Sequence, residues 1–463
     1  MNVFYLLLYS LIILMVYYLL PVKFRPSFLL LASMAFYYLI DAKFLILLLL
    51  EILLSYYVAK QINKRQSIKD KKLFLWLGVL ISLVSLGYFK YQNFFSLGLQ
   101  RVIDSFGLST TSNVEQLLMP IGISYYSFKI ISYLVDTFRN KTVECSLLEY
   151  SLYVSFFPQI ISGPIARSDY LIQQLNNLIY REALFVSGMI NIIVGLFKKI
   201  VIADRMAPYV NTIFTSFMSY PSLASILAVI LYSIQLYCDF SGYSSIAIGI
   251  GQLFGIDSFK NFNFPYFSTN IKEFWSRWHI SLSSWLKDYV YIPLGGNRNG
   301  KLLTKINIII TFLISGIWHG STLNFVVWGL IHGIWNAFSM AKRSRDSINF
   351  KSIVAMVGTY IGVTTSWIFF RMETFSKACD MIGHMFKDFT ISYSAIINTL
   401  LPFTGDNSSV SYLLVLFVLV LFLLIYEWRQ FNGKANSLLW IDVMILCILF
   451  LGSVGSNFLY GQF

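Results

Sequence analysis

The feature that most constrains this chain is a series of long apolar runs, which recur along nearly its whole length. Each run holds about 17 to 25 mostly apolar residues, the length with which an α-helix crosses the hydrocarbon core of a bilayer. The composition agrees, because 57% of the residues are hydrophobic and 12% are charged, whereas soluble domains are about 45–50% apolar and roughly 25% charged. The sequence therefore predicts an all-α polytopic membrane protein, with residues 1–463 forming one integral membrane domain.

Basic residues in the first connections predict the orientation. The run Val3–Leu20 is interpreted as an anchor, because no basic residues precede it and no small-residue cleavage pattern follows it. Residues 27–59 are long enough for two spans, broken near Asp41 and Lys43. Residues 60–72 then carry six basic side chains and one acidic one, which the positive-inside rule places in the cytoplasm. Counting back three spans predicts that the N-terminus lies outside.

The remaining runs alternate with polar loops. They cover residues 73–88, 184–205, 224–250, 308–318, 323–340, 354–370, 411–426 and 438–451. Residues 100–115 and 371–410 are predicted to be external. Cytoplasmic loops are indicated by basic residues: Lys342, Arg343, Arg345 and Lys351 in one, and Arg429 and Lys434 in another. About eleven transmembrane or re-entrant helices result, in a membrane of the bacterial cytoplasmic type.

Irregular and charged stretches within the apolar runs indicate an interior that is not lipid. Proline and glycine interrupt residues 120–136 and 156–167, and broken backbone at membrane depth is tolerated only beside protein or a water-lined cavity. Asp136, Asp204 and Asp239 lie in or beside such runs. Intramembrane charges face an interior, a partner or a water path, although a structural ion pair or helix cap would explain each aspartate equally well.

Residues 272–291 are predicted to form one helix with two faces. Aromatic and apolar side chains recur there at spacings of three and four, and a polar stripe runs along the other side. The apolar face comprises Trp275, Trp278, Leu282, Trp285 and Tyr289, and the polar stripe comprises Lys272, Ser276, His279, Ser283 and Lys287. This pattern favours an interfacial or re-entrant helix over a span, and a plain surface helix with an incidental histidine is the alternative.

Three of the four histidines lie between residues 272 and 332. His279 belongs to the polar stripe, and His319 lies at a glycine hinge between two apolar runs. A neutral imidazole accepts a proton from a hydroxyl near neutral pH, as acyl transfer to an alcohol requires. A packing or hydrogen-bonding role is the alternative for both. His332 and His384 are predicted to be structural.

Several other functions are disfavoured by the residues. The net charge of +13 comes from short loops between apolar runs, which indicates membrane topology rather than nucleic-acid binding. The four cysteines are scattered without metal spacing or an evident disulfide framework. Neither a G-x-S-x-G elbow, a P-loop nor a Rossmann glycine fingerprint is present. No metal and no tightly bound cofactor are predicted.

Long motifs between Pro120 and Gly333 resemble the membrane-bound O-acyltransferases, in particular their alginate O-acetyltransferase-like branch. These motifs occur in the order found in that family. They are PIGISYYSF, FFPQIISGPIAR, FKKIVIADR, YCDFSGYS, NFNFPYFSTNIKEFWSRWHISLSSWLKDYVYIPLGGNR and GIWHG. Residues of about 120–333 are therefore expected to form the catalytic core.

The resemblance implies a ring of tilted helices around a central tunnel. His319, in the WHG motif, matches the family's essential histidine, and His279, in the WHIS motif, matches the second active-site position. His319 is expected to act as general base or to handle the acyl chain, and His279 to orient or polarise. The side chains expected along the tunnel or against substrate are Asp136, Asp239, Trp278, Trp318 and Asn324.

The resemblance also implies the substrates and a partner. The expected donor is a cytoplasmic acetyl thioester, acetyl-coenzyme A, and the acceptor is a glycan hydroxyl beyond the membrane. Gly295, Gly296 and Arg298 form a turn that could offer amides and positive charge to phosphates, or that is simply a tight turn. A separate extracytoplasmic esterase-like transferase is expected to complete delivery to the polysaccharide.

Two alternatives remain open from the sequence. Proteins that transfer D-alanine from a carrier protein to teichoic acid share the WHIS and WHG positions, so those motifs do not exclude that reaction. The second alternative is a transporter or flippase whose buried charges line a translocation path. No inverted repeat of discontinuous helices supports it.

Overall fold

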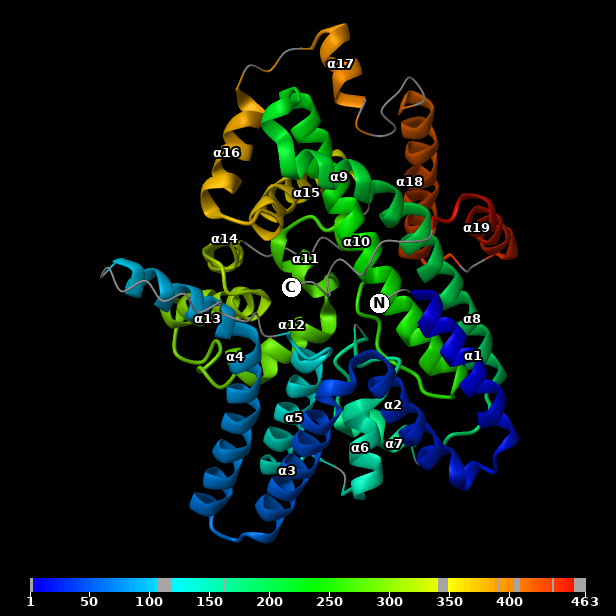
Figure 1. The fold of residues 1–463 in the computed structure, drawn as a ribbon, viewed down its shortest axis with the longest axis vertical. Coiled ribbons are helices and arrows are strands. Elements are labelled where there is room, and N and C mark those ends of the chain that lie inside the picture. The colour runs from blue at the N-terminus through cyan, green and yellow to red at the C-terminus, as the bar shows by residue number, and fades with distance from the viewer. Residues whose placement is uncertain are drawn as a thin grey trace. The chain divides into compact units, whose positions relative to one another are not determined.

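The computed structural model describes residues 3–105, 118–142, 144–161, 163–175, 177–339, 349–387, 389, 391–400, 402, 409–434 and 437–453. Helices joined by turns and loops make up this part of the chain, which contains no strand, and the all-α prediction is confirmed (Figure 1). It divides into two compact units, residues 3–189 with 247–259 and residues 190–246 with 260–463. The predicted loop residues 106–115 and Lys342, Arg343 and Arg345 lie outside the described residues.

Nine apolar helices account for most of the predicted spans. Six described helices are long and apolar enough to cross a bilayer: Ile68–Gln92, Glu182–Ser219, Ser222–Leu253, Lys301–His319, Phe350–Arg371 and Val410–Phe431. Three apolar helices are shorter: Val3–Leu19, Leu323–Phe338 and Leu438–Leu451. Since lipid offers no partner to the backbone, helices satisfy their amides and carbonyls internally. The prediction of a polytopic membrane protein is confirmed.

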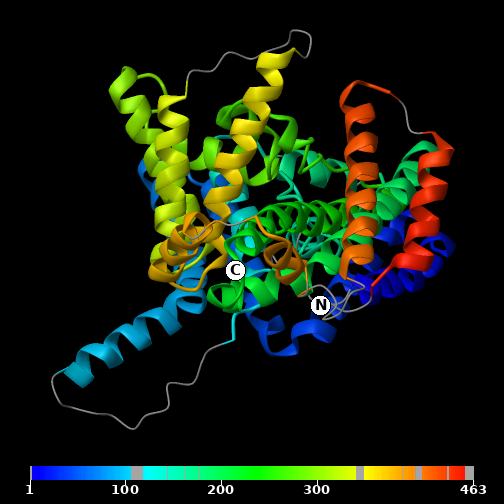
Figure 2. The same cartoon turned by 90° about the horizontal axis from the view of Figure 1, so that it is seen from above.

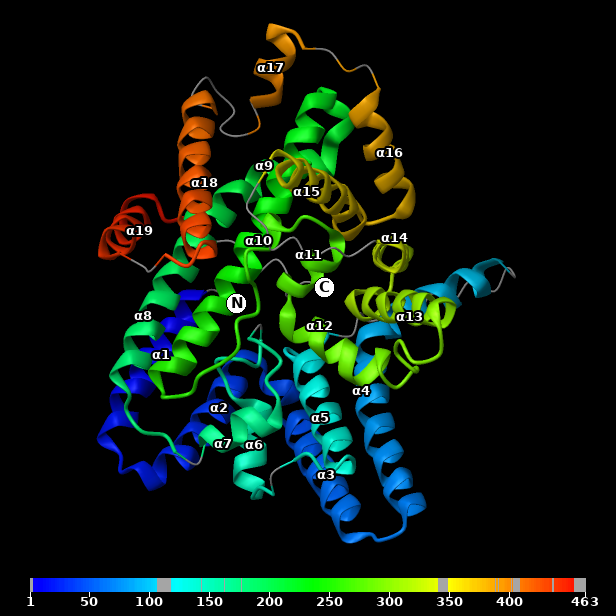
Figure 3. The same cartoon turned by 180° about the vertical axis from the view of Figure 1, so that it is seen from behind.

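The first unit begins with seven helices. They are α1 (Val3–Leu19), α2 (Arg25–Asp41), α3 (Leu45–Lys64), α4 (Ile68–Ser105), α5 (Ile123–Phe138), α6 (Leu147–Ser155) and α7 (Ser168–Leu175). A 3-10 turn at Ala42–Phe44 separates α2 from α3, where the sequence predicts a break. Helices α3, α4 and α5 pack side by side, as Figure 3 shows.

Two predicted irregularities of this unit have different outcomes. The described residues 156–161 and 163–167 contain no helix, as predicted. Residues 123–138, in contrast, form the unbroken helix α5, because Pro120 and Gly122 precede it and do not interrupt it. Gly122 is the N-cap, with φ +77°, a left-handed conformation that glycine adopts without steric cost. The predicted loop also starts later than expected, since α4 continues to Ser105.

The second unit contains four of the six motifs on which the resemblance depends, whereas PIGISYYSF and FFPQIISGPIAR lie in the first unit. Helix α8 (Glu182–Leu196) leads into it and continues as a π-helix (Phe197–Ala203) and α9 (Asp204–Ser216). The following helices are α10 (Ser222–Leu253), α11 (Ile271–Arg277), α12 (Ile280–Leu286), α13 (Lys301–His319), α14 (Leu323–Phe338), α15 (Phe350–Arg371), α16 (Phe375–Phe386), α17 (Tyr393–Leu400), α18 (Ser409–Phe431) and α19 (Leu438–Leu451).

Helices α13 and α14 form a tight hairpin, the yellow-green pair in Figure 2. The sequence predicts this hairpin and its hinge at residues 319–322. A Cβ atom added to Gly329 would lie 2.5 Å from the Phe312 carbonyl oxygen. Gly316 and Gly333 likewise face the backbone of the opposite helix. Small residues let membrane helices approach closely, and packing then holds them together.

Candidate active site

Residues 271–291 do not form the continuous helix that the periodicity predicts. Helix α11 ends at Arg277, α12 starts at Ile280, and a π-turn covers Lys287–Tyr291. The Ile280 amide donates to the Asn261 carbonyl oxygen (2.8 Å), and the Asn263 amide donates to that of Arg277 (2.9 Å). Pairing with the preceding segment therefore replaces helical hydrogen bonds at the break. The spacing of three and four predicts helical structure here, but it predicts one helix and does not reveal this competition.

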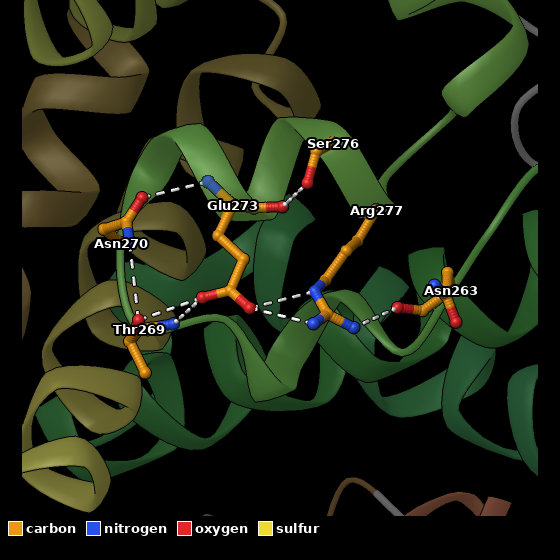
Figure 4. Close-up of polar contacts among 6 residues, drawn as sticks. All are labelled: Asn263, Thr269, Asn270, Glu273, Ser276 and Arg277. Carbon is orange, nitrogen blue, oxygen red and sulfur yellow. Dashed lines mark hydrogen bonds and ion pairs between the residues drawn. The ribbon is translucent and has the colours of Figure 1, made fainter. Parts of the chain in front are cut away.

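The first turn of α11 is fixed by a network of side chains, drawn in Figure 4. The Asn270 side chain caps the helix by accepting from the Glu273 amide (2.9 Å). The Glu273 carboxylate accepts from both the amide and the hydroxyl of Thr269 (2.9 Å each) and from Arg277 Nη2 (2.8 Å). Arg277 Nη1 also donates to the Asn263 carbonyl oxygen (3.2 Å). The network holds α11 against the segment that breaks the helix.

His279 occupies the break itself. Its φ of 44° lies in the left-handed region, which costs energy for a residue with a Cβ atom. Strained backbone of this kind persists only where the surroundings enforce it, and it is concentrated at functional sites. The side chain is fully buried, and its ring meets the edge of the Phe240 ring at a centroid distance of 4.7 Å.

The hydrogen bonds of Asn261 determine which nitrogen of His279 carries the proton. His279 Nδ1 lies 3.1 Å from Asn261 Oδ1, which also accepts from the Ser281 amide (3.1 Å) and lies 2.9 Å from the Ser281 hydroxyl. An amide N–H only donates, so this atom of Asn261 is the carbonyl oxygen. Nδ1 must therefore be the protonated nitrogen. In the neutral ring, Nε2 is then the nitrogen with the basic lone pair.

His319 is the last residue of α13 and is 4% exposed. Three aromatic rings surround it. The centroid distances are 4.6 Å to Trp318, 5.2 Å to Trp328 and 5.1 Å to Phe370. Phe370 belongs to α15, beyond the stretch of motifs, and no sequence signal singled it out. The hinge between α13 and α14 thus places the histidine of the WHG motif among aromatic rings.

A continuous chain of aromatic rings connects the surroundings of the two histidines. Trp328 stacks on Trp367 (5.8 Å between centroids), and Trp367 contacts Trp278 (5.2 Å). Trp278 meets Phe262 (5.1 Å), whose ring lies 6.4 Å from that of His279. The described structure therefore brings His279, His319, Trp278 and Trp318 into one aromatic cluster.

His332 has a structural position, as the sequence predicts. Its Nδ1 accepts a hydrogen bond from Trp275 Nε1 (3.2 Å), because an indole nitrogen only donates. Its Nε2 lies 2.9 Å from the Ser366 hydroxyl, which itself donates to the Val363 carbonyl oxygen (2.6 Å). Nε2 is therefore the donor in that contact. Both nitrogens are used within the helix packing.

The predicted tunnel residues Asp239 and Asn324 make structural contacts. Asp239 Oδ1 lies 2.6 Å from Lys199 Nζ, which lies 2.6 Å from Asp204 as well. Of the two interpretations left open by the sequence, a structural ion pair therefore describes both aspartates. Asn324 Nδ2 donates to the Met372 carbonyl oxygen (2.5 Å), joining the start of α14 to the end of α15.

Asp136 lies in the other unit, near the end of α5. Its carboxylate is 4.0 Å from Arg139, one helical turn further on. This contact is again an ion pair, at the end of a helix. Whether Asp136 meets substrate stays a prediction.

The predicted donor-binding turn uses its amides internally. The amides of Gly295, Gly296 and Arg298 donate to the carbonyl oxygens of Ile292, Tyr291 and Gly295, respectively. The Arg298 side chain is exposed. A phosphate at this turn would therefore meet the guanidinium and not an amide nest. The donor contact stays a prediction, with Arg298 as its remaining group.

A cavity of about 660 Å³ adjoins the break, between α11–α12 and the hairpin. Its polar lining includes Lys272, Ser276, Ser283 and Lys287, four members of the predicted polar stripe. Thr311, Ser315 and Asn336 contribute from α13 and α14. His279, the remaining member, is fully buried and does not line the cavity. The stripe therefore lines a cavity, and its histidine faces the aromatic cluster.

These features define a class: a polytopic helical membrane protein with three buried histidines in one aromatic cluster, beside a cavity with both polar and apolar lining residues. The family model for membrane-bound O-acyltransferases (MBOAT) matches residues 43–351, and the chain belongs to that family. It is accordingly an O-acyltransferase.

Three similar proteins are named for acyl transfer to three different polymers. A probable alginate O-acetylase, AlgI, from Azotobacter vinelandii is 38% identical over 84% of this chain and 79% of its own length. The peptidoglycan O-acetyltransferase of Helicobacter pylori is 33% identical over 95% of this chain and 90% of its own. The teichoic acid D-alanyltransferase of Bacillus subtilis is 31% identical, over 46% of this chain and 57% of its own.

Proposed function

We propose that this protein transfers an acetyl group from a cytoplasmic thioester to hydroxyls of an extracytoplasmic cell-surface polysaccharide. The similarity to two O-acetyl-transferring relatives, over 84% and 95% of the chain, supports acetate as the group moved. The D-alanyl-transferring relative matches 46% of the chain. The observation that supports the chemistry most is the fixed tautomer of His279 in the aromatic cluster that also contains His319.

In the proposed reaction the acceptor hydroxyl attacks the thioester carbonyl carbon. A C–O bond forms, the C–S bond breaks, and the hydroxyl proton passes to an imidazole nitrogen and from there to the departing thiolate. His319 is the proposed base. Its cage of three aromatic rings excludes water, which limits hydrolysis of the thioester and strengthens local electrostatic interactions.

His279 is proposed to assist from the second position. Because Asn261 holds Nδ1–H, Nε2 is the nitrogen that would accept a hydrogen bond from a substrate group or polarise it. Asn261 acts through His279 and is a positioning residue. Proton transfer by a positioned side chain contributes about 10²- to 10⁴-fold to a rate, so removing either imidazole should be severe.

We further propose acetyl-coenzyme A as donor and an esterase-like extracytoplasmic transferase as partner. A donor that enters beside the break would meet Lys272 and Lys287 at the polar-lined cavity, and Arg298 at the following turn. Cationic side chains suit the phosphates of a coenzyme. A bacterial cytoplasmic membrane with the N-terminus outside completes the proposal.

The test is ester formation by cells that express the full chain in a deletion background. We expect His319→Gln to abolish wall- or exopolysaccharide-linked acetate while the protein accumulates in the membrane at the normal level. His384→Gln is the matched control, because His384 lies on α16 and contacts Ser225 (3.1 Å). Retained acetate in the His319→Gln strain would overturn the assignment.

D-alanyl transfer from a carrier protein is the alternative, favoured by the teichoic acid relatives. The mass of the ester lost on deletion distinguishes the two, since acetate and D-alanine differ in mass. A transporter would instead leave the thioester intact in purified, lipid-reconstituted protein. Measurable thioester consumption that depends on His319 would exclude it.

A further inference from the structure

A second cavity lies in the same unit, and neither His279 nor His319 lines it. Its volume is about 520 Å³, and residues of α10, α15, α18 and the 264–267 segment line it. The lining is almost entirely apolar. Leu423, Glu427 and Tyr237 form its floor and are 2%, 3% and 4% exposed, whereas Ile353, Val357 and Leu424 at its mouth are 41–51% exposed. The cavity therefore extends from a buried floor to an exposed mouth.

Glu427, the charged residue on the floor of the cavity, is already paired with neighbouring side chains. Glu427 Oε1 lies 2.6 Å from Lys198 Nζ and accepts a hydrogen bond from the Tyr237 hydroxyl (2.7 Å). Lys198 also lies over the Tyr237 ring, 4.7 Å from its centroid. An ion pair that is already neutralised offers little attraction to a polar ligand. Large cavities lined by apolar side chains also stay dry, so water is a poor occupant.

The mouth faces the medium around two candidate membrane spans. Helices α15 and α18 both meet the criteria for crossing a bilayer. The lining residues lie in the first half of α15 and the last half of α18, and hence at the depth of one leaflet. An apolar opening at that depth is in contact with lipid acyl chains, which can therefore occupy the cavity.

The adjoining helix ends suit an anionic headgroup. Residues 349–351 and 428–434, which flank the cavity, contain Lys351, Arg429 and Lys434 and no acidic residue. Basic residues close to a membrane surface attract anionic lipids. Trp428, which lines the cavity, belongs to the aromatic types that sit at the headgroup level.

From this combination we infer a lipid site: one acyl chain of an anionic phospholipid occupies the cavity, and its phosphate lies beside Lys351 and Lys434, whereas Arg429 stacks on the Trp440 ring of α19. The site is independent of the proposed transferase chemistry, because it uses neither histidine. An occupied cavity would keep α15 against α10. That contact matters to the active site, since α15 also carries Trp367 and Phe370 of the aromatic cluster.

The experiment measures lipid retained by the purified full-length chain. Protein stripped of lipid in detergent is mixed with dioleoyl-phosphatidylglycerol or dioleoyl-phosphatidylcholine and examined by native mass spectrometry. We expect one phosphatidylglycerol bound, about tenfold in preference to phosphatidylcholine. Leu424→Trp, at the mouth, should reduce that binding by about tenfold. Leu421→Trp is the control, because Leu421 is 44% exposed on the same helix and does not line the cavity.

Further variants test the acyl-chain site and the headgroup site separately. Val357→Trp fills the cavity from α15 and replaces Leu424→Trp if that variant fails to fold. Lys351→Gln with Lys434→Gln should remove the preference for phosphatidylglycerol while leaving one lipid bound. Equal retention by the Leu424→Trp and Leu421→Trp variants would overturn the site. Equal binding of the two lipids by the wild type would overturn the anionic headgroup, and displacement by acetyl-coenzyme A would make the occupant the donor instead.

Discussion

The broken segment of residues 261–291 and the α13–α14 hairpin each hold one of the histidines that match the family's motifs, but by opposite means. The hairpin is regular, and its glycines let two straight helices meet until His319 emerges at the turn. The broken segment is irregular, and hydrogen bonds that Asn261 accepts hold His279 in a strained conformation. Regular packing fixes the position of a side chain, whereas the strained segment also fixes which nitrogen of His279 carries the proton.

The sharpest test of this comparison is the substitution His279→Asn. Asparagine tolerates the left-handed backbone better than most residues, so this variant removes the imidazole and keeps the fold. We expect the rate of ester formation to fall about 10²- to 10⁴-fold, measured as product per folded molecule, with Tm in detergent nearly unchanged. A rate close to that of the wild type would show that strain at residue 279 serves folding only.

The next largest effect is expected at Asn261. In Asn261→Ala the Nδ1–H of His279 loses its acceptor. The loss of a hydrogen bond of about 1–3 kcal/mol corresponds to a rate about 5- to 160-fold lower. Asn261→Asp keeps an oxygen that accepts from His279 and Ser281, and should recover part of the rate. Turnover of Asn261→Ala indistinguishable from the wild type would exclude a positioning role.

A substitution that disturbs the packing of the hairpin should lower the stability of the protein rather than the rate of the reaction. In Gly329→Ala the new methyl group would press on the Phe312 carbonyl oxygen, and overpacking of this kind costs about 1–3 kcal/mol. Thermal unfolding in detergent measures the loss. Gly358→Ala on α15 is the control, because a Cβ atom there meets nothing within 4 Å. The same loss in both variants would mean that close packing of the hairpin is not the cause.

The smallest effect is expected from His332→Gln. Glutamine retains a donor and an acceptor for Ser366 and Trp275, so the free energy of unfolding should fall by only about 1 kcal/mol. Ester formation per folded molecule should change by less than about twofold. A large loss of rate with an unchanged Tm would show that His332 takes part in the reaction.

The two regions also differ in how far the sequence predicts them. The hairpin, its hinge at residues 319–322 and the structural role of His332 follow from apolar periodicity and helix length, which are local properties. The break at His279 does not, because it depends on backbone pairing with residues 261–263, and no spacing reveals which segment will compete for those amides. The partners of His279 and His319 also include Asn261 and Phe370, which carry no signal of their own.

The sequence predicts where the buried charged residues lie, but it does not decide their role. The apolar runs locate Asp204 and Asp239, and the pairing of both with Lys199 requires the fold. The catalytic assignments depend on motif resemblance more than on geometry. The central tunnel of the family, the single catalytic domain and the donor contact at Arg298 stay predictions.

The ion pairs of Lys199 have a consequence for biogenesis. A lysine or aspartate near the centre of a membrane helix costs about 2.5–3.5 kcal/mol on insertion. Lys199 and Asp204 share one continuous helical stretch, but the partner of Asp239 lies outside α10. Helix α10 would therefore enter the bilayer with an unmatched carboxylate unless the preceding stretch were still beside it. The translocon should accordingly release the two segments together, as one helical pair.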